Sequence, residues 1–441
     1  MLGNILFTLF VLTEISFIIL SFVKKNNLKR EKAISRLIIV VVFILLVLFS
    51  VIQFGFQWYF IGVFIIIQAI LGLITIIRNK ENKPVHHLKS IVNGLSRILM
   101  ISFFFIPIFL FPQTKQIKPT GQYEIGTVSY TITDHSREEY FTKEIDHRNL
   151  TIQFWYPSQK SGDFLDQNTK YPLVIFSHGA FGFRMSNYST YAELASHGYI
   201  VASIDHTHHA FMTKQTDGKM VIANMEFINN VMGAQKGDIS GNELHQLESE
   251  WMKLRTEDMK FVLDYIKVKS TNTTVSGVFA HIDLEHIGVM GHSLGGATAA
   301  KIARDEEDVD AVIVIDGTMM GEIIGFEDNQ EIITSEPFTK PLLNIYNESH
   351  YYEALQTKDY PNMVAHKNAL DPYQVVVYGS GHMSFTDLPI ISPILANMLE
   401  TGEGVNVDSK YCIETTNKVI LEFFNKYLKG NDEIISRHRT Y

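Results

Sequence analysis

The chain has 441 residues, of which 46% are hydrophobic and 19% charged, and its net charge is −9. That average conceals two regions: residues 1–114 hold 11 basic and 3 acidic residues, whereas the rest of the chain holds 27 and 44. The length, near three times ~150 residues per domain, predicts more than one module. The acidic second region argues against nucleic-acid binding, and the single Cys412 excludes an intramolecular disulfide or a cysteine-based zinc site.

Four apolar runs dominate the first region. Each is close to the ~20 residues that a helix needs to cross a bilayer, where lipid offers no partner to backbone polar groups. We therefore predict a four-helix transmembrane region over residues 1–114, with spans at about 4–22, 37–54, 57–77 and 95–112. Glu14 lies inside the first span, and we interpret it as a helix-paired structural acid, with a functional site as the alternative.

The loops between these runs predict the topology. Segments 24–36 and 78–97 carry six and five Lys or Arg residues, whereas the turn near Gly55 carries no charge. Basic loops stay in the cytoplasm, so the chain after residue 114 is predicted to lie outside the cell membrane.

The second region, residues 115–441, alternates short apolar runs with helical patterns, which predicts a mostly parallel sheet covered by helices on both faces. Segment 149–156 alternates and ends before Pro157, so it is interpreted as an edge-type strand. The other predicted strands are 172–177, 199–205, 286–290, 311–316, 341–346 and 373–379, and the predicted helices include 255–268, 294–304 and 412–428.

Residues 291–296 read GHSLGG between a predicted strand and a predicted helix. This is the G-x-S-x-G elbow, in which a serine occupies a sharp turn and its hydroxyl is lifted above the sheet. Gly291 and Gly295 are required because the backbone segments before and after the serine approach too closely for a Cβ atom. The motif predicts Ser293 as a nucleophile beside the N-terminus of the next helix, where negative charge is stabilised.

A serine nucleophile needs a base and an acid that orients it, and in elbow proteins these follow the serine in the order acid, then histidine. Asp316 ends the strand 311–316, and His382 follows the strand 373–379, so we predict them as acid and base. The competing residues are interpreted as solvated charges or loop side chains; they are Asp305, Asp308, Asp310, His350 and His366.

The oxyanion hole needs two backbone N–H groups. We predict those of Leu294, directly after the nucleophile, and of Ala180 in the loop SHGAFG, with Phe181 as the second choice for the loop donor. His178 in that loop is interpreted as a bridging side chain. The run DHTHH at 205–209 lacks a known ligand spacing, and a serine triad needs no metal, so no metal or cofactor is predicted.

Five segments in the same order resemble one family: FSHGAFGFR, ASHGYIVASIDH, GHSLGG, VIDG and GSGHMSFTDLP. They are similar to the plasma-type platelet-activating-factor acetylhydrolases and their bacterial relatives, over about residues 121–426. The resemblance implies an α/β-hydrolase fold, with Ser293, Asp316 and His382 as the triad and Leu294 and Ala180 as oxyanion donors. It also implies hydrolysis of short or oxidised acyl esters of glycerophospholipids at a lipid surface, without calcium.

The function predicted from these residues is a membrane-embedded serine ester hydrolase that acts on lipid or other small acyl esters. The alternatives are a general carboxylesterase or lipase, and a catalytically retired hydrolase domain whose helices serve a membrane binding role.

Residues 207–254 form a long insertion between a predicted strand and a predicted helix. It is interpreted either as a structural helical insertion or as a cap that walls the acyl pocket. Phe227 and Met232 are the candidate wall residues.

Overall fold

The computed structural model describes residues 2–143, 146–159, 169–272, 276–328, 330–400, 404–431 and 435–441. Contacts between residues divide the chain into two compact units. Unit 1 comprises Met1–Gln116 and Pro389–Met398, and unit 2 comprises Ile117–Leu388 and Leu399–Tyr441.

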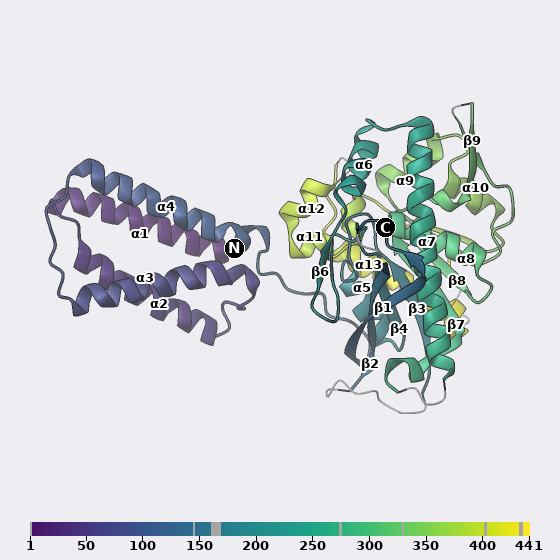
Figure 1. Cartoon of the computed structure of the whole chain (residues 1–441), viewed down its shortest axis with the longest axis horizontal. Coiled ribbons are helices and arrows are strands. Elements are labelled where there is room, and N and C mark those ends of the chain that lie inside the picture. Colours follow the sequence, from purple (N-terminus) through teal and green to yellow (C-terminus); the bar gives the residue numbers. More distant parts are fainter. Residues whose placement is uncertain are drawn as a thin grey trace. The chain divides into compact units, whose positions relative to one another are not determined.

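Unit 1 is built from long apolar helices, in which α1 lies against α4 and α2 against α3 (Figure 1). Its helices are α1 (Leu2–Lys24), α2 (Lys29–Leu48), η1 (Phe56–Trp58), α3 (Tyr59–Ile77) and α4 (His87–Leu110). The aromatic rings of Phe7 and Phe105 meet edge to face, with centroids 5.4 Å apart, and join α1 to α4. The short helices α11 (Leu388–Ile391) and α12 (Pro393–Leu399) overlap the second segment of the unit.

Three helical segments among the described residues are long and apolar enough to cross a membrane: Leu2–Lys24, Phe56–Ile77 and His87–Leu110. The fourth predicted span, 37–54, is not confirmed. Helix α2 starts in a charged segment and ends at Leu48, because Ser50 adopts a left-handed φ of 56° and the Val51 and Ile52 N–H groups bind the Leu46 carbonyl. The 20 residues of α2 are about 30 Å long, but five of the first eight are charged.

Glu14 is paired inside unit 1. Its Oε1 lies 3.3 Å from Nη1 of Arg97, and the carboxylate side chain is 13% exposed. A buried charge is tolerated only when it is paired or hydrogen-bonded. This geometry favours the structural interpretation of Glu14 over the functional one.

Unit 2 contains a nine-stranded sheet of order β1-β2-β4-β3-β7-β8-β11-β12-β13. The strands from β4 to β13 run parallel, whereas β1 and β2 are antiparallel to each other and β2 to β4. The strands are β1 (Glu124–Glu138), β2 (His147–Ser158), β3 (Tyr171–Ser177), β4 (Ile200–Asp205), β7 (Ile282–His292), β8 (Ala311–Ile315), β11 (Leu342–Asn347), β12 (Pro372–Val377) and β13 (His438–Thr440).

The prediction that 149–156 is an edge strand is wrong. This segment belongs to β2, which pairs with β1 on one side and with β4 on the other. The edge on this side of the sheet is β1, a strand that was not predicted from the sequence pattern. Pro157 fits because it lies at the end of the β1–β2 ladder, opposite Ile125, rather than in its middle.

Helices cover both faces of the sheet. One core contains Met259, Val262 and Ile266 of α7 (Gly241–Thr271) with alanines of α8 (Leu294–Asp305), and α10 (Pro361–Asn368) adds Ala365. The other core is formed with α5 (Tyr188–Ser196) and α13 (Ser409–Lys429). The 207–254 insertion forms the hairpin β5 (Met212–Lys214) and β6 (Met220–Ile222), then α6 (Met225–Lys236) and the start of α7. The remaining elements are η2 (Val278–His281), η3 (Met320–Glu322), β9 (Ile323–Glu327), β10 (Gln330–Ile333), α9 (Glu348–Gln356) and η4 (His382–Phe385).

Candidate active site

The predicted nucleophile Ser293 lies in the sharp turn between β7 and α8. Its φ of 56° and ψ of −128° are unusual for a residue with a Cβ atom, and its N–H donates to the Ile315 carbonyl at 2.8 Å. A Cβ on Gly291 would lie 2.1 Å from the Gly295 carbonyl oxygen, and one on Gly295 would lie 2.0 Å from that of Ser177. The predicted steric reason is therefore confirmed for Gly291, whereas Gly295 must lack a Cβ because it packs against the end of β3.

The structure joins the predicted acid and base. His382 Nδ1 donates to Asp316 Oδ2 at 2.7 Å. Asp316 directly follows β8, and His382 begins η4 after β12, so both lie in loops at the carboxyl edge of the sheet. In the described part of the chain, neither His382 Nε2 nor Ser293 Oγ has a hydrogen-bond partner, so the two atoms are not bonded to each other. Hydrogen bonds between catalytic groups are often long when no substrate is bound.

Asp316 is buried and accepts four hydrogen bonds. Besides His382, its donors are the N–H and the side-chain amide of Asn347, at 2.8 and 2.6 Å, and His350 Nδ1 at 3.0 Å. Burial alone would raise the pKa of this carboxyl, but the hydrogen bonds and charges of His350 and His382 outweigh it and hold the pKa well below the ordinary value. Asp316 is therefore an ionised anchor.

His350 shares Asp316 with His382, although the sequence pattern placed it in a loop without a role. Its Nε2 is bound by the Tyr360 hydroxyl at 2.8 Å, so both of its ring nitrogens are occupied. It lies in α9, directly after β11, the neighbour of β8 in the sheet. Of the two histidines on Asp316, only His382 keeps a ring nitrogen available for proton transfer.

Two further residues hold the backbone of His382. Glu400 accepts the N–H groups of His382 at 2.7 Å and Met383 at 3.0 Å. His292 Nε2 donates to the His382 carbonyl at 3.0 Å, and burial lowers the pKa of His292 to about 3, so its ring is neutral. The sequence pattern does not indicate this role for either residue, because the role depends on loops that meet only in the fold.

The predicted oxyanion donors are Leu294, the next residue after Ser293, and Ala180, in the loop after β3. A Cβ on Gly179 would lie 3.1 Å from the Ser293 Cβ, so the loop after β3 packs directly on the elbow. Leu294 begins α8, where the first N–H groups of a helix lack internal partners. None of the hydrogen bonds among the described residues uses the Ala180 N–H. Phe181, the second choice, has a left-handed φ of 60°.

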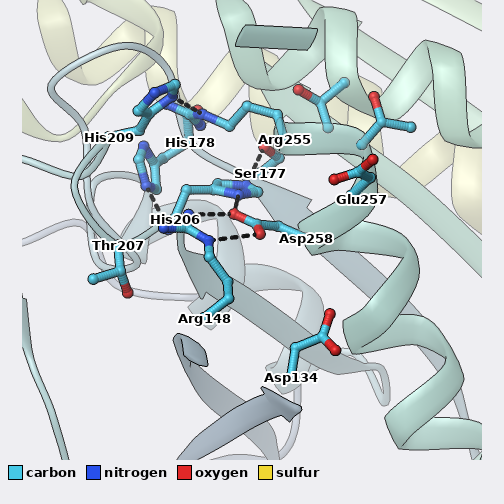
Figure 2. Close-up of polar contacts among 12 residues, drawn as sticks. Asp134, Arg148, Ser177, His178, His206, Thr207, His209, Arg255, Glu257 and Asp258 are labelled. Carbon is cyan, nitrogen blue, oxygen red and sulfur yellow. Dashed lines mark hydrogen bonds and ion pairs between the residues drawn. The ribbon is translucent and has the colours of Figure 1, made fainter. Parts of the chain in front are cut away.

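Behind this loop lies a buried polar cluster, shown in Figure 2. His178 Nδ1 lies 2.7 Å from the Gly179 carbonyl oxygen, and its Nε2 accepts the His206 N–H at 3.3 Å, as the bridging interpretation predicts. His206 joins Ser177 Oγ at 2.9 Å to Asp258 at 3.0 Å. Arg148 completes the cluster by a double hydrogen bond to Asp258, at 3.0 and 2.7 Å.

The histidines of the DHTHH run have partners of different kinds. His206 uses both ring nitrogens on Ser177 and Asp258, and His209 Nδ1 accepts from Arg255 at 3.3 Å. Within the part of the chain that the structure describes, no group of three or more His, Cys, Asp or Glu side chains is arranged to hold a metal ion.

The 207–254 insertion packs onto the predicted oxyanion residues. Phe227 and Val231 of α6 and Trp251 and Met252 of α7 form one apolar cluster with Leu294, to which Ala180, Phe181 and Met320 also pack. Met252 and Met320 in addition line a pocket of about 350 Å³ between α7 and the η3 turn. Met232, the other candidate wall residue, is 43% exposed.

The mostly parallel sheet, the strained serine elbow after a central strand and the loops at its carboxyl edge define an α/β-hydrolase. A solved structure of a ferulic acid esterase from Streptomyces cinnamoneus has the same fold, with a TM-score of 0.53 and 24% identity, and the match covers 72% of this chain and 95% of that one. Within this class, the chain belongs to the family described as platelet-activating factor acetylhydrolase, isoform II, whose profile matches residues 119–436.

Curated relatives agree with this family. The chain is 26% identical to the platelet-activating factor acetylhydrolase of Bos taurus over 282 residues, which are 59% of this chain and 57% of that protein. It is 24% identical to the Cavia porcellus enzyme of the same name, over 62% of this chain and 60% of that protein. The chain therefore spans less than two thirds of the length of these relatives.

Proposed function

We propose that this chain is a membrane-anchored serine ester hydrolase that cleaves short-chain acyl esters, phospholipid esters among them, without a cofactor. The observation that carries the proposal is the 2.7 Å hydrogen bond between His382 and the buried Asp316, in loops beside the strained Ser293 elbow. Membership of the acetylhydrolase family supports an ester as the substrate class.

The proposed reaction proceeds through an acyl-enzyme. His382 Nε2 removes the proton of Ser293 Oγ, which attacks the ester carbonyl carbon, and the Leu294 and Ala180 N–H groups stabilise the oxyanion. His382 then protonates the departing alcohol, and the C–O bond breaks. Water, deprotonated by the same imidazole, attacks the acyl-enzyme and releases the carboxylic acid and free Ser293.

A fluorophosphonate probe tests the proposal, because it reacts covalently with an activated serine. The full chain in detergent is expected to be labelled, and labelling should be lost in Ser293→Ala. Hydrolysis of a panel of acyl esters and phospholipid esters by the same preparation then defines the substrate. A chain that neither binds the probe nor hydrolyses any ester of the panel would be a retired hydrolase domain.

The first further prediction concerns topology. The basic loops 24–36 and 78–97 support a cytoplasmic position for both, which requires α2 as well as α3 to cross the membrane between them. Unit 2 is then expected on the outer side of the cell membrane. Protease added to spheroplasts should digest unit 2, detected by an antibody to its C-terminal end, while a cytoplasmic marker protein stays intact. Digestion of unit 2 only after lysis would place it in the cytoplasm.

The second prediction concerns the insertion as a cap. We propose the 350 Å³ pocket as the acyl site, because Met252, which lines it, also packs in the cluster around Leu294. Met252→Phe is then expected to reduce the space for an acyl chain. The kcat/KM for a hexanoyl ester should fall about tenfold relative to that for an acetyl ester. Losing the contacts of one or two methylene groups in an apolar pocket lowers kcat/KM by about this factor. Met232→Phe, the same change at an exposed position of α6, is the control. Equal losses on both esters would show that the insertion only supports the fold.

A further inference from the structure

Arg255, in helix α7, is a fully buried cation that is held by neutral acceptors (Figure 2). Its Nη1 donates to the His178 carbonyl at 2.7 Å and its Nη2 to the Gly179 carbonyl at 3.4 Å. Its Nε donates to His209 Nδ1 at 3.3 Å. Among the described residues, no carboxylate lies within ion-pair distance of this guanidinium.

The buried carboxylate of the same helix has other partners. Asp258, one turn after Arg255, is taken by Arg148 and His206. Burial lowers the pKa of Arg255 to about 9, which leaves the guanidinium charged at neutral pH. A buried charge is costly unless polar groups compensate it, and here the compensation comes from carbonyl dipoles of the loop that carries the predicted oxyanion donor.

Peptide geometry transmits this contact to the other side of the loop. In a trans peptide, the carbonyl and the N–H of the next residue point in opposite directions. The Gly179 carbonyl belongs to the same peptide as the Ala180 N–H. That carbonyl accepts from Arg255, from His178 Nδ1 at 2.7 Å and from the Gly182 N–H at 3.1 Å. Three donors on one side therefore fix the direction of the Ala180 N–H on the other.

The surrounding histidines keep the arrangement in one protonation state. Burial, and then the positive charge of Arg255, hold the pKa values of His178 and His209 well below the ordinary value, so both rings are neutral. His209 also stacks face to face on Phe227, with centroids 3.7 Å apart, which fixes the acceptor of the Arg255 Nε. The guanidinium thus has a rigid set of acceptors.

We propose that Arg255 is a positioning residue for ester hydrolysis, which orients and polarises the His178–Gly179–Ala180 peptides from behind so that the Ala180 N–H is aimed at the oxyanion. The inference rests on the proposed function of the chain. A cation bound to a carbonyl increases the positive charge on the N–H of the same peptide, because hydrogen bonds in a chain polarise one another. The benefit is greatest in the tetrahedral intermediate, where the oxygen is charged, and small for the neutral substrate.

Arg255→Met and Arg255→Lys, made in the full chain in detergent, test this role. Active sites are counted by end-point fluorophosphonate labelling, so misfolded protein does not affect the rates. For p-nitrophenyl acetate, Arg255→Met is expected to lower kcat per labelled site by about 10²–10³-fold, the cost of losing one oxyanion donor, and to leave KM within about twofold. Arg255→Lys should recover part of the loss, since an ammonium group cannot hold both carbonyls in the planar geometry of a guanidinium.

A trifluoromethyl ketone inhibitor provides a readout that a merely structural residue would not change. Ser293 converts it to a charged hemiketal that occupies the oxyanion hole. In the Arg255 variants its Ki should rise by the same factor by which kcat/KM falls. Arg304→Met is the matched control. Arg304 lies in α8, and its Nε donates to the Glu322 carboxylate at 2.8 Å. The variant should therefore lose stability but keep the wild-type kcat and Ki.

Three results would overturn the inference. They are an unchanged kcat per labelled site in Arg255→Met, a lowered kcat with an unchanged Ki, and an equal loss in Arg304→Met. If Arg255→Met does not accumulate, Arg255→Lys is the deciding variant. Its kcat/KM is expected to fall and its Ki to rise, each by about tenfold. Unchanged values of both would contradict the role. A wild-type chain that is neither labelled nor active would instead contradict the proposed function.

Discussion

Ser293→Ala is expected to lower kcat for p-nitrophenyl acetate by about 10⁴–10⁶-fold, and His382→Ala by a similar factor. The reason is that the serine hydroxyl and the imidazole act in the same proton transfer, so removing either one removes the covalent pathway. The double variant should be hardly slower than each single one. Initial rates of the full chain in detergent, with thermal unfolding to verify folding, provide the measurement.

Two control variants make this prediction specific. Ser349→Ala changes an exposed serine of α9 and should keep full activity. His350→Gln removes the second histidine on Asp316, whose Nε2 is already bound by Tyr360. It should lower the rate far less than His382→Ala does. The opposite order of the two histidine variants would make His350 the base and His382 the support.

Asp316→Asn is expected to lower kcat/KM roughly 10⁴-fold and to shift its pH profile. Burial alone would lower the pKa of His382, but the hydrogen bond and the charge of Asp316 outweigh it, so the pKa lies above the ordinary value near 6.5. The base must be neutral, so activity falls as the pH drops through this pKa, and the wild-type midpoint should lie above about 6.5. In Asp316→Asn the hydrogen bond to the charged carboxylate and the charge of Asp316 are lost, and only the charge of Glu400 still opposes burial, so the midpoint should move down. Rates between pH 5 and 9 measure both values; a normal rate and an unmoved midpoint would show that another residue is the acid.

The strands and the elbow could be predicted from the sequence because their causes are local. Continuous apolar runs such as 172–177 and 311–316 are required for strands buried on both faces, and both segments are strands. Gly291 and Gly295 mark the turn because a Cβ atom cannot fit at either position. Strand ends then predict where loop residues such as Asp316 gather, and the structure joins Asp316 to His382.

The parts that could not be predicted depend on which elements become neighbours. His350 contacts Asp316 because β11 lies beside β8, an order that helical and strand periodicity do not contain. Arg255 belongs to the long helix α7, and its charge would normally place it on the solvent face. It is buried because the loop after β3 presents two carbonyls there, a feature of backbone geometry rather than of residue pattern.

The four donors around Asp316 also determine how many protons the proposed reaction moves at once. A carboxylate whose oxygens are already occupied by Asn347, His350 and His382 is a very weak base, and its pKa lies well below the ordinary value. The proton taken from Ser293 therefore stops on the imidazole and does not continue to the acid. Positive charge is stored on His382, opposite the negative charge of the oxyanion, and the ion pair that they form lasts until the same proton leaves with the alcohol.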